Sequence, residues 1–539
     1  MTGPGVDSDA AEVDDPADPS DAPVAHDLPV GVWIAAPFLA VLYPGLVYQW
    51  IFGVHAFRTV LYLSTTALLA VLALGTWALL HYLAFNRDLR RSTGVTAILV
   101  VAVFSWPSWT AVGEGLANVT HIGILLDIAP VLIAGGLLWA AVRYADRDRF
   151  IVIVDGALIG VLAILAFGMV PRLADSTEVA SAGPPEAQNP NVVMLIVDGY
   201  ARADVLGSLY EFDNSAFLAG LTERGFQVRD DAVANYSVTH TSLSSIMAAD
   251  YPFEEGARSD ASMDRMRRLL SGDGLIMQTF AGAGYETLMF ENAWSGSLCG
   301  RTPDACHRTG LLSRSLWSLG QSSPLAPVQR MVTPHPFTAI GLQHIRELGG
   351  LLDDDASTRQ FIFAHVTVPH PPTQLSASCD FIVAADRVAL LLASADSTEE
   401  DKAIGRDRYV EQMRCINDEV LTTIDQLIAA DQDVEIVLVS DHGPDSQAQF
   451  AKDVEDWTDG ELLERLGVLS AVRMPAQCDE RGPARTTINT VRRAVGCALG
   501  TPIEELPERI FIAPAAQEVD EVIVDVTDRM DSISGAFGR

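Results

Sequence analysis

The sequence predicts a membrane bundle of α-helices followed by an exported α/β domain, in which helices cover a mostly parallel sheet. Three observations lead to this fold class. Five long apolar segments lie between residues 30 and 171, strand-length apolar runs alternate with helical patterns after residue 191, and all six cysteines follow the last apolar segment. The chain of 539 residues is also too long for one core, so two or three domains are expected.

Residues 1–29 are expected to form a disordered acidic tail. They are rich in Asp, Pro and Ala and contain no aromatic residue, so they cannot bury enough apolar surface to fold. The tail has no basic segment ahead of an apolar run, which argues against a signal peptide. The whole chain has a formal net charge of −34, and this acidity excludes a nucleic-acid-binding surface.

Residues 30–171 are predicted to form a membrane domain with five spans. Each apolar segment is long enough to cross about 30 Å of hydrocarbon as a helix. The segments cover residues 30–53, 60–84, 94–113, 121–142 and 150–170. Arginines gather between the second and third segments and between the fourth and fifth, whereas the alternate loops hold only Arg58. The positive-inside rule therefore makes the N-terminus cytoplasmic and places everything after residue 171 outside the membrane.

The cysteines support this orientation independently. An even number of cysteines confined to the exported part is typical of disulfides. Six cysteines allow fifteen pairings. A zinc site built from paired Cys-x-x-Cys sequences has no counterpart here. Closeness in the sequence favours the pairs Cys299–Cys306, Cys379–Cys415 and Cys478–Cys497.

The exported part begins with a linker and continues as an α/β domain. Residues 172–190 are small, polar and Pro-containing, and residues 191–539 are predicted to form the catalytic domain. Apolar runs at 192–197, 360–366 and 434–439 are predicted strands, and helical patterns lie near 214–224, 239–249, 262–271 and 404–429. Such alternation is typical of parallel strands connected by helices.

Metal-binding side chains follow three of these strands. Asp198 comes after the first, His365 lies near the end of the second with His370 in the next loop, and Asp441–His442 follow the third. The carboxyl ends of parallel strands share one edge of a sheet, where ligands bind. Singly, an Asp before Gly is usually a turn residue and a buried His is usually structural. Together, two carboxylates and an imidazole predict a site for one divalent ion, zinc or manganese, with an open position.

The segment 235–242 (NYSVTHTS) supplies hydroxyl groups at the start of a predicted helix. A hydroxyl in the first helical turn lies beside unpaired backbone N–H groups and the positive end of the helix dipole, which stabilise an alkoxide and bind a tetrahedral anion. A metal ion would activate such a hydroxyl further. The common structural role of Ser and Thr at this position is the N-cap, and composition alone favours that role.

Five stretches resemble the sulfatase-like branch of the alkaline phosphatase superfamily, and more narrowly its membrane-anchored lipoteichoic acid synthases and phosphoethanolamine transferases. Their order and spacing agree over about half of the chain. The stretches are VDGYARADVL (197–206), NYSVTHTSLSSIM (235–247), FAHVTVPHPP (363–372), YVEQMRCIND (409–418) and SDHGPD (440–445).

The resemblance implies a role for each matching residue. Thr239, in the pattern Thr-x-x-Ser with Ser242, would be the covalent nucleophile. His370, with His365, would contact the transferring group or protonate the leaving oxygen. Asn235, Arg202 and Ser242 would contact substrate. The implied metal ligands are Asp198, Thr239, Asp441 and His442.

Two departures from the family pattern bear on the reaction. Synthases and phosphoethanolamine transferases usually have Glu where Asp198 stands, whereas sulfatases and phosphatases have Asp. The sulfatase signature Cys-x-Pro-x-Arg is absent, and Cys299 is followed by Gly-Arg-Thr. The second departure disfavours hydrolysis of sulfate esters.

The expected function is metal-dependent phosphotransfer or hydrolysis of phosphodiester headgroups in the cell envelope, through a covalent phosphothreonine. The substrate would be carried by a lipid or a glycan. Alternatives are a sulfuric-ester or phosphate-ester hydrolase and a non-catalytic envelope protein that binds glycans or partners. A transporter is disfavoured, because acidic residues within the spans are few. Asp127 and Asp155 lie inside the spans without a matching basic residue, and they could pair across helices or line a headgroup cavity. The acceptor and the oligomeric state stay open.

Overall fold

The computed structural model describes residues 28–52, 59–120, 125–173, 189–254, 256–257, 260–292, 297, 299–352, 359–382, 399–447, 449–478, 482–513 and 522–537. Residues 1–27 of the predicted tail and residues 174–188 of the predicted linker lie outside these ranges, as does the side chain of Asp127. The predictions for them, and the domain boundaries that depend on them, stay predictions.

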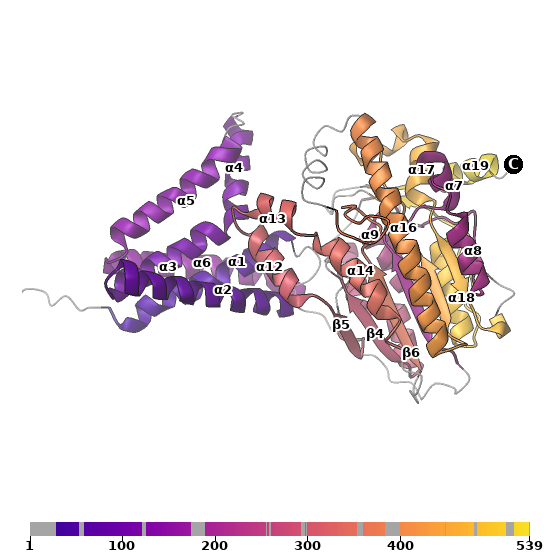
Figure 1. The fold of residues 1–539 in the computed structure, drawn as a ribbon, viewed down its shortest axis with the longest axis horizontal. Coiled ribbons are helices and arrows are strands. Elements are labelled where there is room, and N and C mark those ends of the chain that lie inside the picture. The colour runs from indigo at the N-terminus through magenta and orange to yellow at the C-terminus, as the bar shows by residue number, and fades with distance from the viewer. Residues whose placement is uncertain are drawn as a thin grey trace, which may run out of the picture.

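In the N-terminal part, up to residue 173, the described residues form helices and short connections, without a strand (Figure 1). Helices α1, α2, α3 and α6 run side by side, whereas α4 and α5 diverge from them as a pair. The bounds are α1 (Val30–Phe52), α2 (Thr59–Leu79), a π-helical turn η2 (Leu80–Ala84), α3 (Leu89–Phe104), α4 (Trp106–Thr120), α5 (Leu125–Tyr144) and α6 (Asp148–Leu173).

The prediction of five spans is confirmed only in part. Within the described residues, two helices are long and apolar enough to cross a membrane, Val30–Val47 and Val60–Ala84. A third crossing is obtained if the bent pair Leu89–Phe104 and Trp106–Ala117 counts as one span. The apolar part of α5, Ile128–Tyr144, is shorter than a full span.

The predicted single helix at 94–113 is wrong, because the chain breaks at Ser105 and bends by 60° between α3 and α4. Pro107 explains the break. It has no N–H to donate into the preceding turn, and its ring clashes with the carbonyl four residues before it. The N–H of Trp106 donates instead to the carbonyl of Ser322, 3.1 Å away in the part of the chain after residue 189, which is named the exported part after its predicted location.

The exported part is built on a seven-strand sheet with the order β2-β8-β7-β1-β6-β4-β5 among the described residues. Strands β7, β1, β6, β4 and β5 are parallel, and β8 is antiparallel to both of its neighbours. A small sheet, β3-β10-β9, lies apart from it. The bounds are β1 (Val192–Val197), β2 (Gln227–Val228), β3 (Gly256–Ala257), β4 (Glu286–Glu291), β5 (Ala305–Arg308), β6 (Gln360–Val366), β7 (Glu435–Val439), β8 (Ser470–Arg473), β9 (Phe511–Ile512) and β10 (Val522–Asp525).

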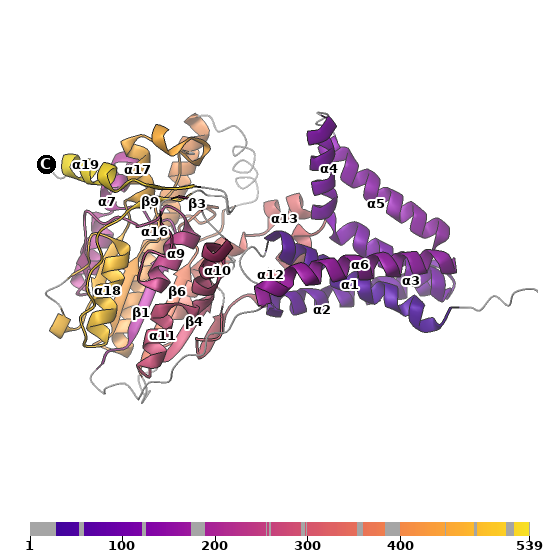
Figure 2. The same ribbon diagram turned by 180° about the vertical axis from the view of Figure 1, so that it is seen from behind.

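Helices cover both faces of the sheet. One face carries α7 (Ala203–Leu209), α8 (Ser215–Glu223), α14 (Pro336–Leu348) and α16 (Glu399–Ala430), as Figure 1 shows. The other carries α9 (Thr239–Ala248), α10 (Asp260–Arg268), the π-helical turn η3 (Leu269–Asp273), α11 (Leu275–Gly282) and α18 (Thr487–Ala498), as in Figure 2. The remaining helices are α12 (Leu311–Gln321), α13 (Ala326–Val332), α17 (Asp459–Leu466) and α19 (Thr527–Phe537).

The buried strand β1 shows why its sequence is apolar throughout. Leu195 packs into the core under α14 and α16, whereas Met194 and Ile196 pack into the core under α9 and α11. A central parallel strand must be apolar on both faces, which produces a continuous run rather than an alternating pattern. The prediction of a mostly parallel sheet covered by helices is therefore confirmed.

All three predicted disulfides are present. Cys299–Cys306, Cys379–Cys415 and Cys478–Cys497 are bonded, with Cα atoms 6.0, 5.0 and 5.8 Å apart, and no cysteine is free. Each bridge closes a loop within the exported part, as sequence proximity predicted.

Candidate active site

Strand β1 lies between β6 and β7 and brings the predicted residues to one edge of the sheet. Ile196 is in register with His365 of β6 and with Val439 of β7. Because all three strands run parallel, Asp198 and the Asp441–His442 pair emerge at the same level. Asp198, His365, Asp441 and His442 are all buried.

Two glycines allow the chain to turn tightly beside these residues. Gly199 adopts a φ of +75°, in the left-handed region, directly after Asp198. Gly443 has an ordinary φ, but a Cβ atom there would lie 1.9 Å from the carbonyl oxygen of Glu464. The glycines that follow the Asp and His of these motifs are thus required by backbone conformation in one case and by packing in the other.

The backbone holds one oxygen of Asp441 and leaves the other for a ligand. Oδ1 accepts hydrogen bonds from the N–H of Gly199 at 3.2 Å and from its neighbour His442 at 2.9 Å. The hydroxyl of Ser242 donates to the carbonyl of Asp441 at 2.6 Å. Oδ2 is buried without a hydrogen-bond partner among the described residues.

His442 presents an unprotonated nitrogen to the same point. Its Nδ1 lies 2.9 Å from the carbonyl oxygen of Gly443, which can only accept, so Nδ1 carries the proton of the neutral ring. Nε2 then offers its lone pair. It lies 2.8 Å from Oγ1 of Thr239, 3.3 Å from Oδ2 of Asp441 and 3.6 Å from Oδ1 of Asp198. Burial lowers the pKa of His442 well below its usual value, which keeps the ring neutral.

The buried carboxylates of Asp198 and Asp441 repel each other. Oδ1 of Asp198, like Oδ2 of Asp441, is buried without a hydrogen-bond partner in the described part of the chain. Burial and then the charge of Asp198 raise the pKa of Asp441 to about 7. Burial also acts to raise the pKa of Asp198, but histidines 370, 365 and 442 outweigh it and lower that pKa below its usual value. Unpaired buried oxygens are costly, and a divalent cation is the group that satisfies them.

His365 lies on the far side of Asp198. Its Nε2 is 3.4 Å from Oδ2 of Asp198, whereas His442 faces Oδ1. The amide of Asn292 donates to Nδ1 of His365 at 2.8 Å, and Oγ of Ser297 is 3.0 Å from the same nitrogen. With Nδ1 accepting, the proton of the neutral ring is on Nε2 and is directed at Asp198.

Two ligand sets are therefore available, and they share both carboxylates. Asp198, His365 and Asp441 have ligand atoms within 4.8 Å of one another. The set with His442 in place of His365 fits a metal better, because its nitrogen carries a lone pair and because Thr239 supplies a fourth atom. In this arrangement Nε2 of His365 lies 3.4 Å from Oδ2 of Asp198, at ion-pair distance.

Thr239 is the first residue of α9 and presents its hydroxyl to His442. The first N–H groups of a helix have no intrahelical acceptor and lie at the positive end of the helix dipole. Arg465 fixes the segment that leads into α9, since its guanidinium donates to the carbonyls of Ser237 and Gly443. The buried Arg465 thus links the segment before α9 to the segment that follows β7.

His370 lies at the edge of the cluster and is only partly buried. The backbone N–H of His370 donates to the carbonyl of Asp198 at 2.9 Å, and its ring centroid is 5.9 Å from the ring centroid of His442. Nδ1 donates to the carbonyl of Pro371 at 2.6 Å, which leaves Nε2 to exchange a proton with a substrate.

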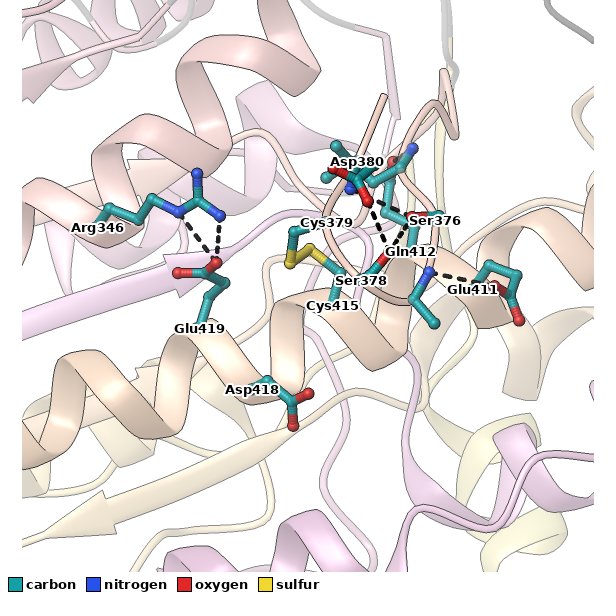
Figure 3. The surroundings of a disulfide bond; sticks show 12 residues. Arg346, Ser376, Ser378, Cys379, Asp380, Glu411, Gln412, Cys415, Asp418 and Glu419 are labelled. Carbon is teal, nitrogen blue, oxygen red and sulfur yellow. Dashed lines mark hydrogen bonds and ion pairs between the residues drawn. A yellow bond between two sulfur atoms is a disulfide. The ribbon is translucent and has the colours of Figure 1, made fainter. Parts of the chain in front are cut away.

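Helix α16 positions the loop that carries His370. The buried Gln412 donates to the carbonyl of Pro369 at 2.9 Å and accepts from the N–H groups of Gln374 and Leu375. One turn further along, Cys415 is bonded to Cys379 at the end of the same loop (Figure 3). The motif at 409–418 therefore supports the site without supplying a ligand.

The three predicted substrate contacts make hydrogen bonds within the protein. The amide of Asn235 donates to the hydroxyl of Tyr251 and the carbonyl of Arg509. Its oxygen accepts from the N–H of Ile488, so both ends of the amide are hydrogen-bonded within the protein. Arg202 pairs with Asp204 at 2.7 Å and donates to the carbonyl of Ala232.

Ser242 uses its hydroxyl on the carbonyl of Asp441. Asn235, Arg202 and Ser242 are all buried, and their role as substrate contacts stays a prediction.

Sequence reasoning missed Arg465, Asn292 and Ser297. Arg465 lies in α17, which has a clear capping box at Thr458 and Glu461, but nothing in the sequence marks this arginine as a neighbour of the site. Asn292 follows the apolar strand β4, and its place after a parallel strand was the one available signal.

Comparison with known proteins identifies a related family. A protein-family model described as Sulfatase matches residues 190–462. A comparison with curated proteins found no match.

Three solved structures with similar folds show low sequence identity. The C-terminal periplasmic domain of EcEptC from Escherichia coli is 12% identical with a TM-score of 0.39, and 64% of this chain and 96% of that chain are covered. Lipooligosaccharide phosphoethanolamine transferase A (EptA), an integral membrane protein from Neisseria meningitidis, is 13% identical with a TM-score of 0.39, over 86% and 95%.

A putative sulfatase from Bacteroides thetaiotaomicron is 13% identical with a TM-score of 0.40, over 60% and 78%. Because these scores are below 0.5, the family match alone carries the assignment.

Proposed function

Since this chain belongs to the sulfatase family, in the sulfatase-like branch of the alkaline phosphatase superfamily, we propose that it is a membrane-anchored, metal-dependent enzyme acting on phosphodiester headgroups in the cell envelope. A covalent phosphothreonine on Thr239 carries the reaction. The observation behind the proposal is that Oγ1 of Thr239 lies 2.8 Å from the unprotonated Nε2 of His442, beside two unpaired carboxylate oxygens.

One divalent ion, zinc or manganese, would be held by Asp198, Thr239, Asp441 and His442. Nitrogen and carboxylate oxygen are ligands that suit both metals. The unpaired oxygens Oδ1 of Asp198 and Oδ2 of Asp441 support this set, because they face the lone pair of His442. When bound, the ion lowers the pKa of the Thr239 hydroxyl and offsets negative charge on the phosphoryl group.

In the first step, Oγ1 of Thr239, as the alkoxide left when its proton passes to solvent, attacks phosphorus in line with the leaving alcohol. The bond between Oγ1 and phosphorus forms, and the bond between phosphorus and the alcohol oxygen breaks. His370 gives the proton to the departing alkoxide, a role that its position at the edge of the cluster supports. The N–H groups of the first turn of α9 hold the phosphoryl oxygens.

In the second step, an acceptor alcohol or water attacks the phosphothreonine. The bond between the acceptor oxygen and phosphorus forms, the bond between Oγ1 and phosphorus breaks so that Oγ1 leaves as the alkoxide, and His370 takes the proton of the attacking hydroxyl. An alcohol acceptor makes the enzyme a transferase, and water makes it a hydrolase. The same residues serve both outcomes, so the chemistry of the site leaves the acceptor open.

The membrane part gives the proposed location. We propose that α1 to α6 make five crossings, with the bent pair α3 and α4 as one, so that the catalytic domain lies outside the membrane. The arginines at residues 87, 90 and 91 and at 143, 147 and 149 support this orientation. A multi-pass anchor suits a substrate carried by an envelope lipid or glycan.

Hydrolysis of sulfate or phosphate esters is the second candidate, favoured by the family itself. The position that sulfatases fill with a modified Cys or Ser is Thr239 here, and Cys-x-Pro-x-Arg is absent. These two features support phosphorus over sulfur. A non-catalytic envelope protein is disfavoured by the presence of every proposed ligand.

The test compares three full-length proteins: wild type, Thr239→Val and Thr241→Val. Both substitutions keep the side-chain shape. Thr241 is the matched control, since its hydroxyl bonds to the carbonyl of Val238 in the same helical turn. Each protein is incubated with labelled phosphatidylglycerol, phosphatidylethanolamine and a chromogenic sulfate ester.

We expect wild type and Thr241→Val to release diacylglycerol and to carry a phosphate on Thr239 in mass spectra. Thr239→Val should lose activity by about 10³-fold or more. Turnover of the sulfate ester alone would overturn the proposal, and so would diacylglycerol release that survives Thr239→Val.

A further inference from the structure

Helices α12 and α13 form a hairpin that leaves the catalytic domain and lies against the membrane helices. Figure 1 shows the pair between the two parts of the molecule, after β5 and before α14. Oγ of Ser315 lies 2.7 Å from Oγ of Ser64 in α2, and Leu319 is buried in the apolar core of the membrane bundle. The carbonyl of Ser322 accepts the N–H of Trp106 at the bend between α3 and α4.

The other side of the hairpin exposes large apolar residues. On α12, Leu312 is 67% exposed and Leu316, one turn later, is 50% exposed. Leu325, Val328 and Val332 follow helical spacing and are 65%, 52% and 58% exposed. Isolated exposed leucines are ordinary on soluble proteins, but a row of this length on adjoining helices marks an interaction surface.

This apolar surface continues the lipid-facing surface of α2. Leu63 precedes Ser64, the residue that bonds to the hairpin, and is 58% exposed. In the orientation that the arginines predict, α2 begins at its outer end. Ser64 lies five residues after Thr59, so the contact is about 8 Å along the helix from its outer end at 1.5 Å per residue. Interfacial helices bury their apolar face to about 5–10 Å.

The charge of the hairpin and its surroundings also indicates contact with lipid. The chain has 70 acidic residues, yet residues 305–346 contain no Asp or Glu. Arginines remain in the segment, and Arg330 is exposed on α13. A long stretch without acid in an acidic protein suits contact with anionic lipid headgroups.

We propose that the α12–α13 hairpin is seated in the outer leaflet, with its apolar row in the lipid and Arg330 among the headgroup phosphates. The hairpin thereby holds the catalytic domain at a fixed height over the membrane. It is also tied to the site: the buried Arg314 of α12 pairs with Glu291 at 3.0 Å, and the next residue, Asn292, donates to His365.

The proposal is independent of which bond the enzyme breaks. The alternative partner for the apolar row is a second copy of this chain. The lipid is favoured by the shared surface with α2, by the depth of the Ser64 contact and by the absence of acidic residues.

The test places single cysteines on the full-length protein. All six native cysteines are paired, so an added cysteine is the free thiol. Leu312→Cys and Val328→Cys are labelled with an environment-sensitive fluorophore and reconstituted in nanodiscs that contain phosphatidylglycerol and nitroxide-labelled lipid. Leu275→Cys on α11 is the matched control, because that leucine is 55% exposed on the catalytic domain. All three positions are exposed, so the substitutions leave the core intact.

We expect the labels at 312 and 328 to shift to the blue and to be quenched severalfold more than the label at 275. Quenching equal to that of the control would overturn the proposal. Oxidation of Leu312→Cys to a covalent dimer in nanodiscs would assign the face to a second copy and would also overturn it. Neither readout depends on phosphotransfer, so failure here is distinguishable from failure of the proposed reaction.

Discussion

The hydroxyl oxygen of Thr239 lies 2.8 Å from Nε2 of His442, although 203 residues separate the two in the chain. The contact arises because α9 begins beside the carboxyl end of β7. The hydroxyl of Ser242, one turn into α9, donates to the carbonyl of Asp441 and fixes the distance. Thr239 and His442 are thus held together by a hydrogen bond between α9 and the segment that follows β7.

Replacing Asp441 by Asn should remove the metal. Asn keeps the shape of the side chain but not the charge, and Oδ2 of Asp441 is, with Oδ1 of Asp198, one of the two carboxylate oxygens of the site that are buried without a hydrogen-bond partner among the described residues. We expect wild-type protein to hold about one zinc or manganese ion per chain by elemental analysis, and Asp441→Asn to hold almost none. Asp445→Asn is the control, since that exposed carboxylate lies in the same motif. Near-stoichiometric metal in Asp441→Asn would count against this ligand set.

Metal binding should weaken as the pH falls. Burial, followed by the charge of Asp198, raises the pKa of Asp441 to about 7. Only the ionised carboxylate binds a cation, so binding releases this proton. The apparent affinity should fall about tenfold per pH unit below about pH 7 and level off above it, as measured by competition with a chelating dye. An affinity that is constant from about pH 5.5 to 8 would contradict the assignment.

The stability of the metal-free protein should change with pH in the opposite sense. The folded-state pKa of Asp441 is raised above its unfolded value of about 3.9, so its protonated form favours the fold. This contribution is complete below about pH 3.9 and is lost as the pH rises through about 7. The melting temperature should therefore rise more on adding zinc at about pH 8 than at about pH 6. Equal zinc-induced shifts at both values would argue that Asp441 is ionised throughout.

Gln412 should affect catalysis without affecting the metal. It holds the loop of His370 by three hydrogen bonds, and Gln412→Leu leaves the carbonyl of Pro369 and two N–H groups unpaired in a buried place. We expect kcat to fall and hydrogen exchange at residues 369–375 to speed up, while metal content is unchanged. Gln426→Leu is the control on an exposed part of the same helix. Loss of metal in Gln412→Leu would show a general collapse instead.

The strands that bear the site were predictable because their surroundings are simple. Strands β1, β6 and β7 are buried on both faces, so their sequences are continuous apolar runs, and parallel pairing then determines where Asp198 and Asp441 emerge. Strands β5 and β8 have four residues each and lack such a run. The bend at Ser105 was also readable in principle, from Pro107 inside an apolar segment.

The roles of buried polar residues were not predictable in the same way. Family resemblance marks Asn235 and Arg202, but only coordinates show that their hydrogen bonds are used on Tyr251, Asp204 and backbone carbonyls. Arg465 has no motif around it and reaches the site because α17 packs across the turn at Gly443. Long-range packing decides these contacts, and local sequence patterns carry no record of it.

The ion pair between Glu291 and Arg314 should contribute far more to the free energy of unfolding than the ion pair between Arg346 and Glu419. Glu291 and Arg314 are 8% and 4% exposed and 3.0 Å apart, so Glu291→Gln leaves a buried guanidinium with a weaker partner. Losing one member of a buried pair costs about 3–5 kcal/mol. The side chain of Arg346, which Figure 3 shows paired with Glu419, is 51% exposed, and losing an exposed pair costs about 0–1 kcal/mol.

Unfolding of the full-length protein in detergent, followed by tryptophan fluorescence, should therefore separate Glu291→Gln from the control Glu419→Gln. Because Glu291 lies between the hairpin and Asn292, activity should fall with stability in the first variant and hold in the second. Equal destabilisation by the two substitutions would mean that the hairpin is held to the catalytic domain by its apolar contacts rather than by this pair.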